Sequence, residues 1–195
     1  MKKIIMAAVV AAFAASPALA QTVRMGTEGA YPPYNFINDK NEVDGFERHA
    51  GDELCKRAQL DCVWVVNDWD SIIPNLISGN YDTIIAGMSI TDERDKVIDF
   101  TQSYFPPSPS YYVGLSGSSV DVSKAVIAAQ VGTIQAGHVA GSGGTLVEFA
   151  TPEETIAAVR NGEADAVLAD SDYLNPIVNE SGGALAVVGE VSLGD

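Results

Sequence analysis

The chain has 195 residues, of which 26 are acidic and 11 are lysine or arginine, and its net charge is −15. A protein this acidic is repelled by nucleic acid and by anionic lipid, so neither is expected as a partner. The length allows two domains of ordinary size.

Residues 1–20 have the pattern of a secretory signal peptide: a basic start "MKK", an apolar run, and a final "ALA" of small residues. The apolar run is too short and too rich in alanine to span a membrane. We expect an exported, periplasmic protein that does not insert into the membrane. Its mature chain would begin at Gln21, and loss of the two lysines of the leader would bring the net charge from −15 to −17.

Strand and helix patterns alternate over the first half of the mature chain. The sequence predicts strands at 23–28, 62–66 and 81–87 and helices at 49–58 and 71–79. This βαβ alternation is typical of a parallel sheet with helices on its faces.

Cys55 lies near the end of the first predicted helix, and Cys62 lies at the start of the strand that follows. In an exported protein such a pair is more typical of a disulfide than of a metal site. Two thiols without nearby histidines are also a poor zinc site. We therefore expect a structural disulfide and no bound metal.

The stretch after the third predicted strand carries groups that suit a carboxylate ligand. The strand closes on Ala86 and Gly87, a serine follows at Ser89, and a guanidinium comes at Arg94. An arginine binds a carboxylate as a bidentate fork, and the N–H groups at a helix start add partial positive charge. The alternative is a structural turn in which Ser89 or Thr91 caps a helix and Arg94 faces solvent.

The alternation stops in the segment 102–115. Its prolines forbid a helix, whereas the two tyrosines and the valine near its end favour an extended backbone. We expect a hinge crossing at 109–115, between a first lobe at 21–108 and a second lobe at 116–195.

The alternation restarts in the second lobe. Pro152 at the start of one helix, two glutamates in its first turn and Gly162 at its end mark that element clearly. The sequence predicts helices at 133–140, 152–162 and 171–179 and strands at 125–130, 145–150, 164–170 and 184–188. The fold class is therefore α/β with two lobes.

Several motifs occur in the order found in one known family. They are "VRMGTEGAYPPYNF", "VDGFERHAGDELCKR", "DWDSIIPNLISGNYDTIIAGMSITDER", "VIDFTQSYF", "QVGTIQ" and "GEADAVLAD". From Gln21 to Asp195 the chain resembles the periplasmic amino-acid-binding proteins of ABC transporters, especially the histidine and lysine/arginine/ornithine group. The resemblance implies the two-lobed type II fold of periplasmic binding proteins, which closes by a hinge motion around one amino acid and uses no cofactor.

The resemblance implies which residues hold the main chain of the ligand. Arg94 and the backbone around Ser89 would bind the α-carboxylate, together with backbone N–H groups near Thr133 and Ile134 on the other lobe. Asp170 would take the α-ammonium group. The alternative for Asp170 is a helix N-cap that follows a strand.

The resemblance also implies how the ligand's side chain is recognised. Tyr31 and Trp69 match two aromatic positions that sandwich the side chain, and an aromatic face suits a cation. Glu28 matches a carboxylate that faces the tip of the ligand, so it favours a positive charge. Gln135 is a further residue expected to contact the side chain of the ligand. The alternative for the two aromatic residues is an ordinary place in the core.

Ala86 and Gly87 stand where some relatives have serines, and this difference leaves the choice among arginine, lysine, ornithine and histidine open. Relatives have a further C-terminal part, so we expect the sequence to be truncated at Asp195. The resemblance implies a monomer that delivers a free amino acid to the permease of an ABC importer.

Two other functions fit the same fold. Cyclohexadienyl dehydratases add acid–base groups in the cleft, but His49 and His138 have no nucleophile pattern nearby. Receptors use the fold as a ligand-sensing ectodomain; no transmembrane segment occurs up to Asp195, and the expected truncation would hide one that follows, so this alternative stays open. We expect a binding protein and no enzymatic activity.

Overall fold

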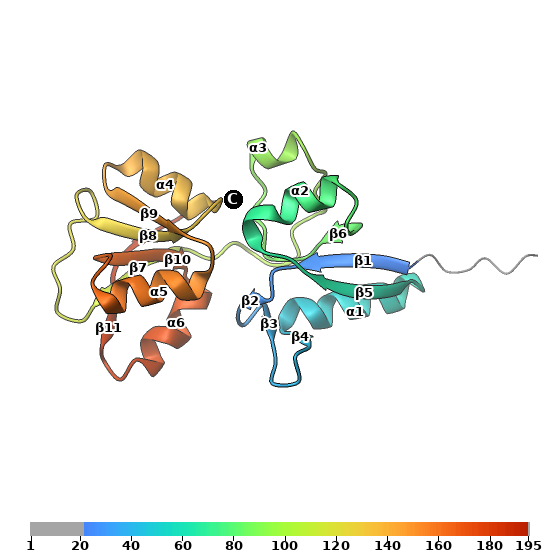
Figure 1. The fold of residues 1–195 in the computed structure, drawn as a ribbon, viewed down its shortest axis with the longest axis horizontal. Coiled ribbons are helices and arrows are strands. Elements are labelled where there is room, and N and C mark those ends of the chain that lie inside the picture. Colours follow the sequence, from blue (N-terminus) through green and yellow to red (C-terminus); the bar gives the residue numbers. More distant parts are fainter. Residues whose placement is uncertain (1–21, 195) are drawn as a thin grey trace, which may run out of the picture.

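The computed structural model describes residues 22–194, which form two lobes joined by an extended connection (Figure 1). The predicted signal peptide at 1–20 lies outside the described residues. The first lobe is built on a parallel sheet of three strands in the order β5-β1-β6. These strands are β1 (Thr22–Thr27), β5 (Asp61–Val66) and β6 (Thr83–Ile84).

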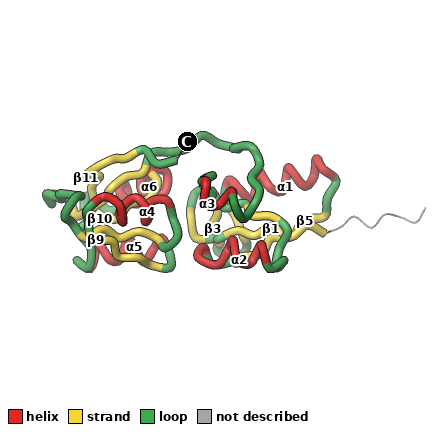
Figure 2. The backbone as a smooth tube through the Cα atoms, turned by 90° about the horizontal axis from the view of Figure 1, so that it is seen from above, coloured by secondary structure: helices red, strands yellow, loops and turns green. Residues whose placement is uncertain are grey.

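Helices cover both faces of this sheet. Figures 1 and 2 show α1 (Phe46–Ala58) on one side of β1 and α2 (Ile72–Ile77) on the other. A short 3-10 helix, η1 (Trp69–Ser71), leads into α2, and one turn of helix, α3 (Asp92–Asp95), follows β6. The predicted disulfide between Cys55 and Cys62 is present and ties the end of α1 to the start of β5.

The first lobe also contains a small antiparallel sheet that the sequence analysis missed. It consists of β2 (Ala30–Tyr31), β3 (Asn35–Ile37) and β4 (Val43–Asp44). Strands of two or three residues are too short to show a period of two. They bring Tyr31 to the edge of the lobe that faces the second lobe.

The second lobe is a five-stranded sheet in the order β11-β7-β10-β8-β9. The strand β7 is antiparallel to both of its neighbours, β11 and β10, and the other neighbouring strands are parallel. The five strands are β7 (Ser110–Leu115), β8 (Val126–Gln130), β9 (Thr145–Phe149), β10 (Ala166–Asp170) and β11 (Leu185–Val191).

The prediction of a hinge crossing at 109–115 needs correction, because most of this segment is strand β7 inside the second-lobe sheet. Tyr112 and Val113 are buried there, and β7 is paired on both sides. The connection between the lobes is the stretch before it, where the prolines lie.

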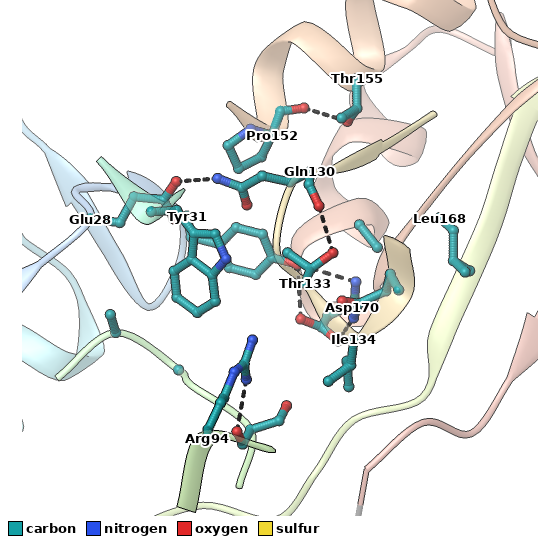
Figure 3. A pocket seen from close by; sticks show the side chains of 16 residues that line it. Glu28, Tyr31, Arg94, Gln130, Thr133, Ile134, Pro152, Thr155, Leu168 and Asp170 are labelled. Carbon is teal, nitrogen blue, oxygen red and sulfur yellow. Dashed lines mark hydrogen bonds between the residues drawn. The ribbon is translucent and has the colours of Figure 1, made fainter. Parts of the chain in front are cut away.

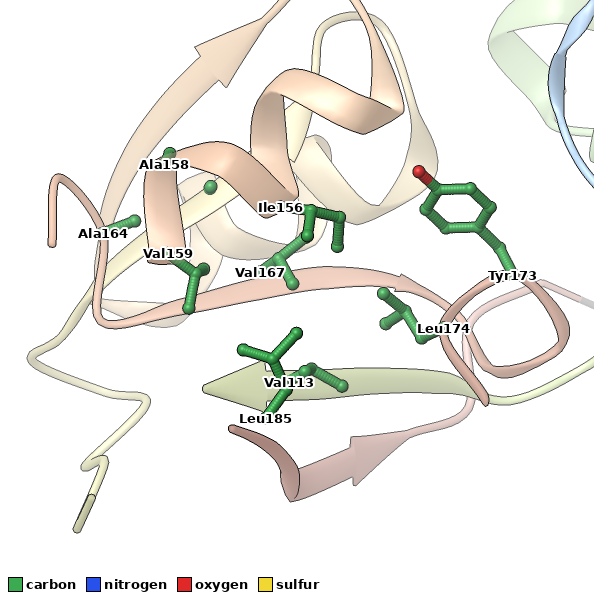
Figure 4. Close-up of a cluster of buried hydrophobic side chains, with 10 residues drawn as sticks. Val113, Ile156, Ala158, Val159, Ala164, Val167, Tyr173, Leu174 and Leu185 are labelled. Atoms are coloured by element: carbon green, nitrogen blue, oxygen red, sulfur yellow. The ribbon is translucent and has the colours of Figure 1, made fainter. Parts of the chain in front are cut away.

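Side-chain alternation along the central strands separates two cores. Val113 and Val167 point toward α5 (Pro152–Asn161) and α6 (Ser171–Glu180), as Figure 4 shows, and Ala128 belongs to the same cluster. Their neighbours Tyr112, Ile127 and Leu168 point to the other face, where α4 (Ile134–Ser142) packs through Val139.

The helix α5 begins and ends where the sequence predicts. Thr151 and Glu154 form a capping box, Pro152 occupies the first turn, and Gly162 closes the helix with a φ of 76°. No helix within residues 22–194 combines the length and the apolar character needed to cross a bilayer.

Candidate functional site

A pocket of about 560 Å³, counted out to its opening, lies between the lobes (Figure 3). Its first-lobe wall comes from the ends of β1 and β6 and from α3, and its second-lobe wall comes from β8, β10, α4 and α5. All eleven residues predicted to contact a ligand line it: Glu28, Tyr31, Trp69, Ala86, Gly87, Ser89, Arg94, Thr133, Ile134, Gln135 and Asp170.

Five further lining residues were not predicted from the sequence. Gln130, Leu168 and Ala169 lie at the carboxyl ends of β8 and β10, where open α/β sheets bind their ligands, and this rule could have found them. Pro152 and Thr155 belong to the first turn of α5, and no signal in the sequence sets them apart from an ordinary helix start.

Arg94 lies half-buried in the pocket with its guanidinium held on two sides. Nη1 donates to the carbonyl of Ser89 at 2.8 Å, and Nη2 donates across the cleft to the carbonyl of Gly132 at 3.0 Å. The guanidinium carbon lies 5.5 Å from the ring centre of Trp69. The alternative of a structural turn is right in that Thr91 caps α3. Arg94, however, lines the pocket and does not face solvent.

The Arg94 guanidinium has no acidic partner among the ion pairs of residues 22–194. Burial lowers its pKa from the ordinary value for arginine. A half-buried cation held only by carbonyls and an aromatic ring is suited to an anionic ligand, because such a ligand would supply the missing charge.

Asp170 stands at the N-cap position of α6, yet its side chain makes no capping hydrogen bond. One carboxylate oxygen accepts from the hydroxyl of Tyr31 at 2.9 Å, and the other accepts from Nε2 of Gln135 at 2.8 Å. Burial raises the pKa of the carboxyl group. The side chain is thus held in the pocket wall rather than over the helix end.

Tyr31, in the pocket wall, connects the two lobes through contacts of its side chain with the second lobe. In addition to the contact with Asp170, its ring stacks on Tyr173 of α6, with ring centres 4.5 Å apart and planes 15° from parallel. Only the remaining part of the ring is available to a ligand. Trp69, in contrast, is covered by no other aromatic ring in the described part of the chain.

Glu28, at the end of β1, is 8% exposed. Its Oε1 accepts a hydrogen bond from Nε2 of Gln130 in the second lobe, at 2.5 Å (Figure 3). Burial raises the pKa of Glu28 to about 7; the hydrogen bond from Gln130 opposes this shift, and the charge of Asp68 adds to it.

The helix α4 points its N-terminus into the pocket. Thr133 caps it by accepting from the N–H of Ala136 at 3.1 Å, and its hydroxyl donates to the carbonyl of Gln130. The N–H groups of Ile134 and Gln135 have no acceptor within the helix. They add partial positive charge on the second-lobe side of the pocket.

Neither histidine lines this pocket. The side chain of His49 is 80% exposed and lies 3.7 Å from Asp44, whereas His138 belongs to α4. The two histidines considered for an enzymatic alternative therefore lie outside the pocket wall formed by the described residues.

Comparison with known proteins supplies the family. Residues 23–125 match the sequence family of bacterial extracellular solute-binding proteins, family 3. A putative ABC transporter arginine-binding protein 2 of Escherichia coli (strain K12) is 32% identical over 195 residues, covering 97% of this chain and 79% of that protein.

Two solved structures resemble the whole described fold. A periplasmic His/Glu/Gln/Arg/opine family-binding protein from Silicibacter pomeroyi, in complex with lysine, is 76% identical with a TM-score of 0.85 over 88% of this chain and 78% of that one. An ancestral arginine-binding protein bound to arginine is 29% identical with a TM-score of 0.82, over 89% of this chain and 81% of that one.

Proposed function

The chain belongs to family 3 of the bacterial extracellular solute-binding proteins, and we propose that it captures one amino acid with a cationic side chain in the pocket between its lobes. The distribution of charge in the pocket carries this proposal. Arg94 has no acidic partner, and Glu28 and Asp170 have no basic partner, among the ion pairs of the described chain. One carboxylate and two positive groups on a ligand would complement this set.

The α-carboxylate is assigned to the positive side of the pocket. The guanidinium of Arg94 and the backbone around Ser89 approach it from the first lobe. The N-terminus of α4, at Thr133 and Ile134, approaches it from the second lobe. Because the two lobes supply these groups, the grip is complete only when the cleft is closed.

The α-ammonium group is assigned to Asp170, which Gln135 and Tyr31 already hold in place. The side chain of the ligand would pass Trp69 and the free part of the Tyr31 ring. Its charged end would reach Glu28, whose second carboxylate oxygen accepts no hydrogen bond within the described protein. The backbone at Ala86 and Gly87 completes the first-lobe wall.

The relatives support a cationic ligand, since two of the similar structures contain lysine and arginine, although an ancestral arginine-binding protein is also found bound to glutamine. The pocket residues do not separate arginine, lysine, ornithine and histidine from one another. Glu28 separates these cations from neutral and acidic amino acids.

The relatives also support the cellular role. We propose a periplasmic monomer, exported by the leader at 1–20, that delivers its amino acid to the permease of an ABC importer. The two lobes would move about the proline-containing connection that precedes β7.

Calorimetric titration with the standard amino acids tests this function. The wild-type protein should bind lysine or arginine, and Arg94→Ala should bind no amino acid, because all of them share the α-carboxylate. Arg57→Ala is the control, since Arg57 is an exposed arginine of α1 paired with Glu53. Native binding of any amino acid by Arg94→Ala would refute the assignment of the carboxylate site.

A further inference from the structure

The helix α1 carries a fully buried carboxylate that does not line the pocket. Glu47 is 0% exposed and has no basic partner in the described chain. Its Oε1 accepts from the backbone N–H of Gly87 at 2.6 Å and from the hydroxyl of Tyr104. Its Oε2 accepts from Nδ2 of Asn35 at 2.7 Å.

These hydrogen bonds continue through Asn35 to the other side of the first-lobe wall. Asn35 is 1% exposed, and its Oδ1 accepts from the backbone N–H of Gly29 at 2.7 Å. Gly29 directly follows Glu28, and Gly87 itself lines the pocket. One buried network thus ends on two backbone segments that form the ligand pocket.

From this network we infer that Glu47 is a positioning residue, which sets the affinity of the pocket without touching the ligand. Its carboxylate fixes the two pocket-forming backbone segments, at Gly29 and Gly87, relative to each other. The inference rests on the proposed function, because it concerns the same pocket.

The contact with Glu47 fixes the orientation of the peptide group between Ala86 and Gly87. This peptide is trans, so its C=O points opposite to its N–H. The N–H points to Glu47, so the carbonyl of Ala86, a residue that lines the pocket, points away from Glu47. Gly87 has a φ of 59°, which a glycine adopts without steric cost and a residue with a side chain rarely does.

The network requires a residue that only accepts hydrogen bonds at position 47. Three donors converge on Glu47, and a carboxylate satisfies all of them. In Glu47→Gln the new NH₂ group would face Nδ2 of Asn35 if it replaced Oε2, and the N–H of Gly87 if it replaced Oε1, which would leave that N–H only the hydroxyl of Tyr104 at 3.2 Å as an acceptor. Asn35 cannot turn to accommodate it, because its Oδ1 already accepts from the N–H of Gly29.

The polarity of the network therefore predicts both a loss and a rescue. Glu47→Gln should weaken lysine and arginine binding by the same factor, about tenfold or more, since one buried donor loses its partner. The double variant Asn35→Asp/Glu47→Gln moves the carboxylate from position 47 to its hydrogen-bonded neighbour at position 35, and every donor of the network then has an acceptor again. It should bind both ligands within about threefold of wild type.

Calorimetric titration at a temperature well below the thermal unfolding midpoint of each variant measures these affinities. Glu53→Gln is the matched control, because it makes the same change at an exposed position of α1. If Glu47→Gln is folded and binds lysine as wild type does, Glu47 is merely structural and the inference is overturned. If Glu47→Gln does not fold, the double variant decides: near-native affinity supports the inference, and a folded protein with weak binding overturns it.

The amide resonances of Gly29 and Gly87 provide a test that needs no ligand. In the NMR spectrum of the free protein, the amide proton chemical shifts of both glycines should change in Glu47→Gln and return toward the wild-type values in the double variant. They should stay unchanged in Glu53→Gln. Unmoved resonances would overturn the inference whatever the ligand. A wild-type protein that binds no amino acid would instead overturn the proposed function, and with it the role of Glu47 in affinity.

Discussion

Arg94 is the residue on which the proposed grip of the ligand's main chain depends. It is held by carbonyls from both lobes, at Ser89 and Gly132, and so has a fixed orientation. Arg94→Lys keeps the charge but loses the planar fork that matches a carboxylate. Affinity should fall for every amino acid by one common factor, about tenfold or more, in calorimetric titrations. A loss confined to one ligand would assign Arg94 to side-chain recognition instead.

Glu28 should make the binding of a cation depend on pH. With the lobes placed as in the structure, burial against the second lobe raises the pKa of Glu28 to about 7, so the carboxyl group is increasingly protonated below neutral pH. A cationic side chain requires the ionised form, so binding must release this proton. Affinity for lysine should therefore fall about tenfold for each pH unit below 7. Glu28→Gln should remove that part of the slope, and an identical slope in both proteins would contradict the prediction.

The candidate pocket residues could be predicted because their motifs are local. Arg94 and Ser89 stand five residues apart in one stretch, and Asp170 ends a recognisable strand. Gln130 was missed because its role depends on Glu28 of the other lobe, 102 residues away in the chain. Glu47 was missed for the same reason, since its partners come together only in the folded lobe.

Among the elements, those with local end signals were predicted best. Thr151, Pro152 and Gly162 fix α5 through caps that the sequence displays. The start of α1 was placed at His49 instead of Phe46, because the buried Glu47 interrupts the apolar pattern that marks a helix face. The strand β7 was assigned to the hinge because its pairing with β10 and β11 is set by long-range contacts.

The disulfide should stabilise the first lobe without affecting the ligand. It closes a short loop between α1 and β5, and its two residues do not line the pocket. Replacing both cysteines by serine should lower the free energy of unfolding by about 2–3 kcal/mol, measured by urea denaturation. The affinity for lysine should stay unchanged. Weaker lysine binding would mean that the bridge also holds the pocket wall.

In the whole molecule, contacts outside the pocket also hold the lobes together. The hydroxyl of Tyr34, in the first lobe, donates to Oδ2 of Asp172 in α6 at 2.5 Å, and Ser108 donates to the same carboxylate. Neither Tyr34 nor Ser108 lines the ligand pocket. Ser108 lies in the connection just before β7, so it is the bond from Tyr34 that joins the lobes and would favour the closed form whatever ligand is bound.

Tyr34→Phe should therefore shift the free protein toward the open form. A lost interlobe hydrogen bond would weaken the binding of every ligand by the same factor, about three- to tenfold. Calorimetry measures the affinities, and small-angle X-ray scattering should give a larger radius of gyration for the free variant. A change for one ligand only would place Tyr34 in the binding site rather than in lobe closure.

The central claim is that the pocket is complementary to a zwitterion with a cationic side chain. Arginine and citrulline test it most directly, because they have nearly the same shape and differ in charge. The claim predicts that wild-type protein binds arginine more tightly than citrulline by about tenfold or more, and that this ratio approaches one in Glu28→Gln. A calorimetric ratio that is the same in both proteins, or a wild-type preference for citrulline, would contradict it.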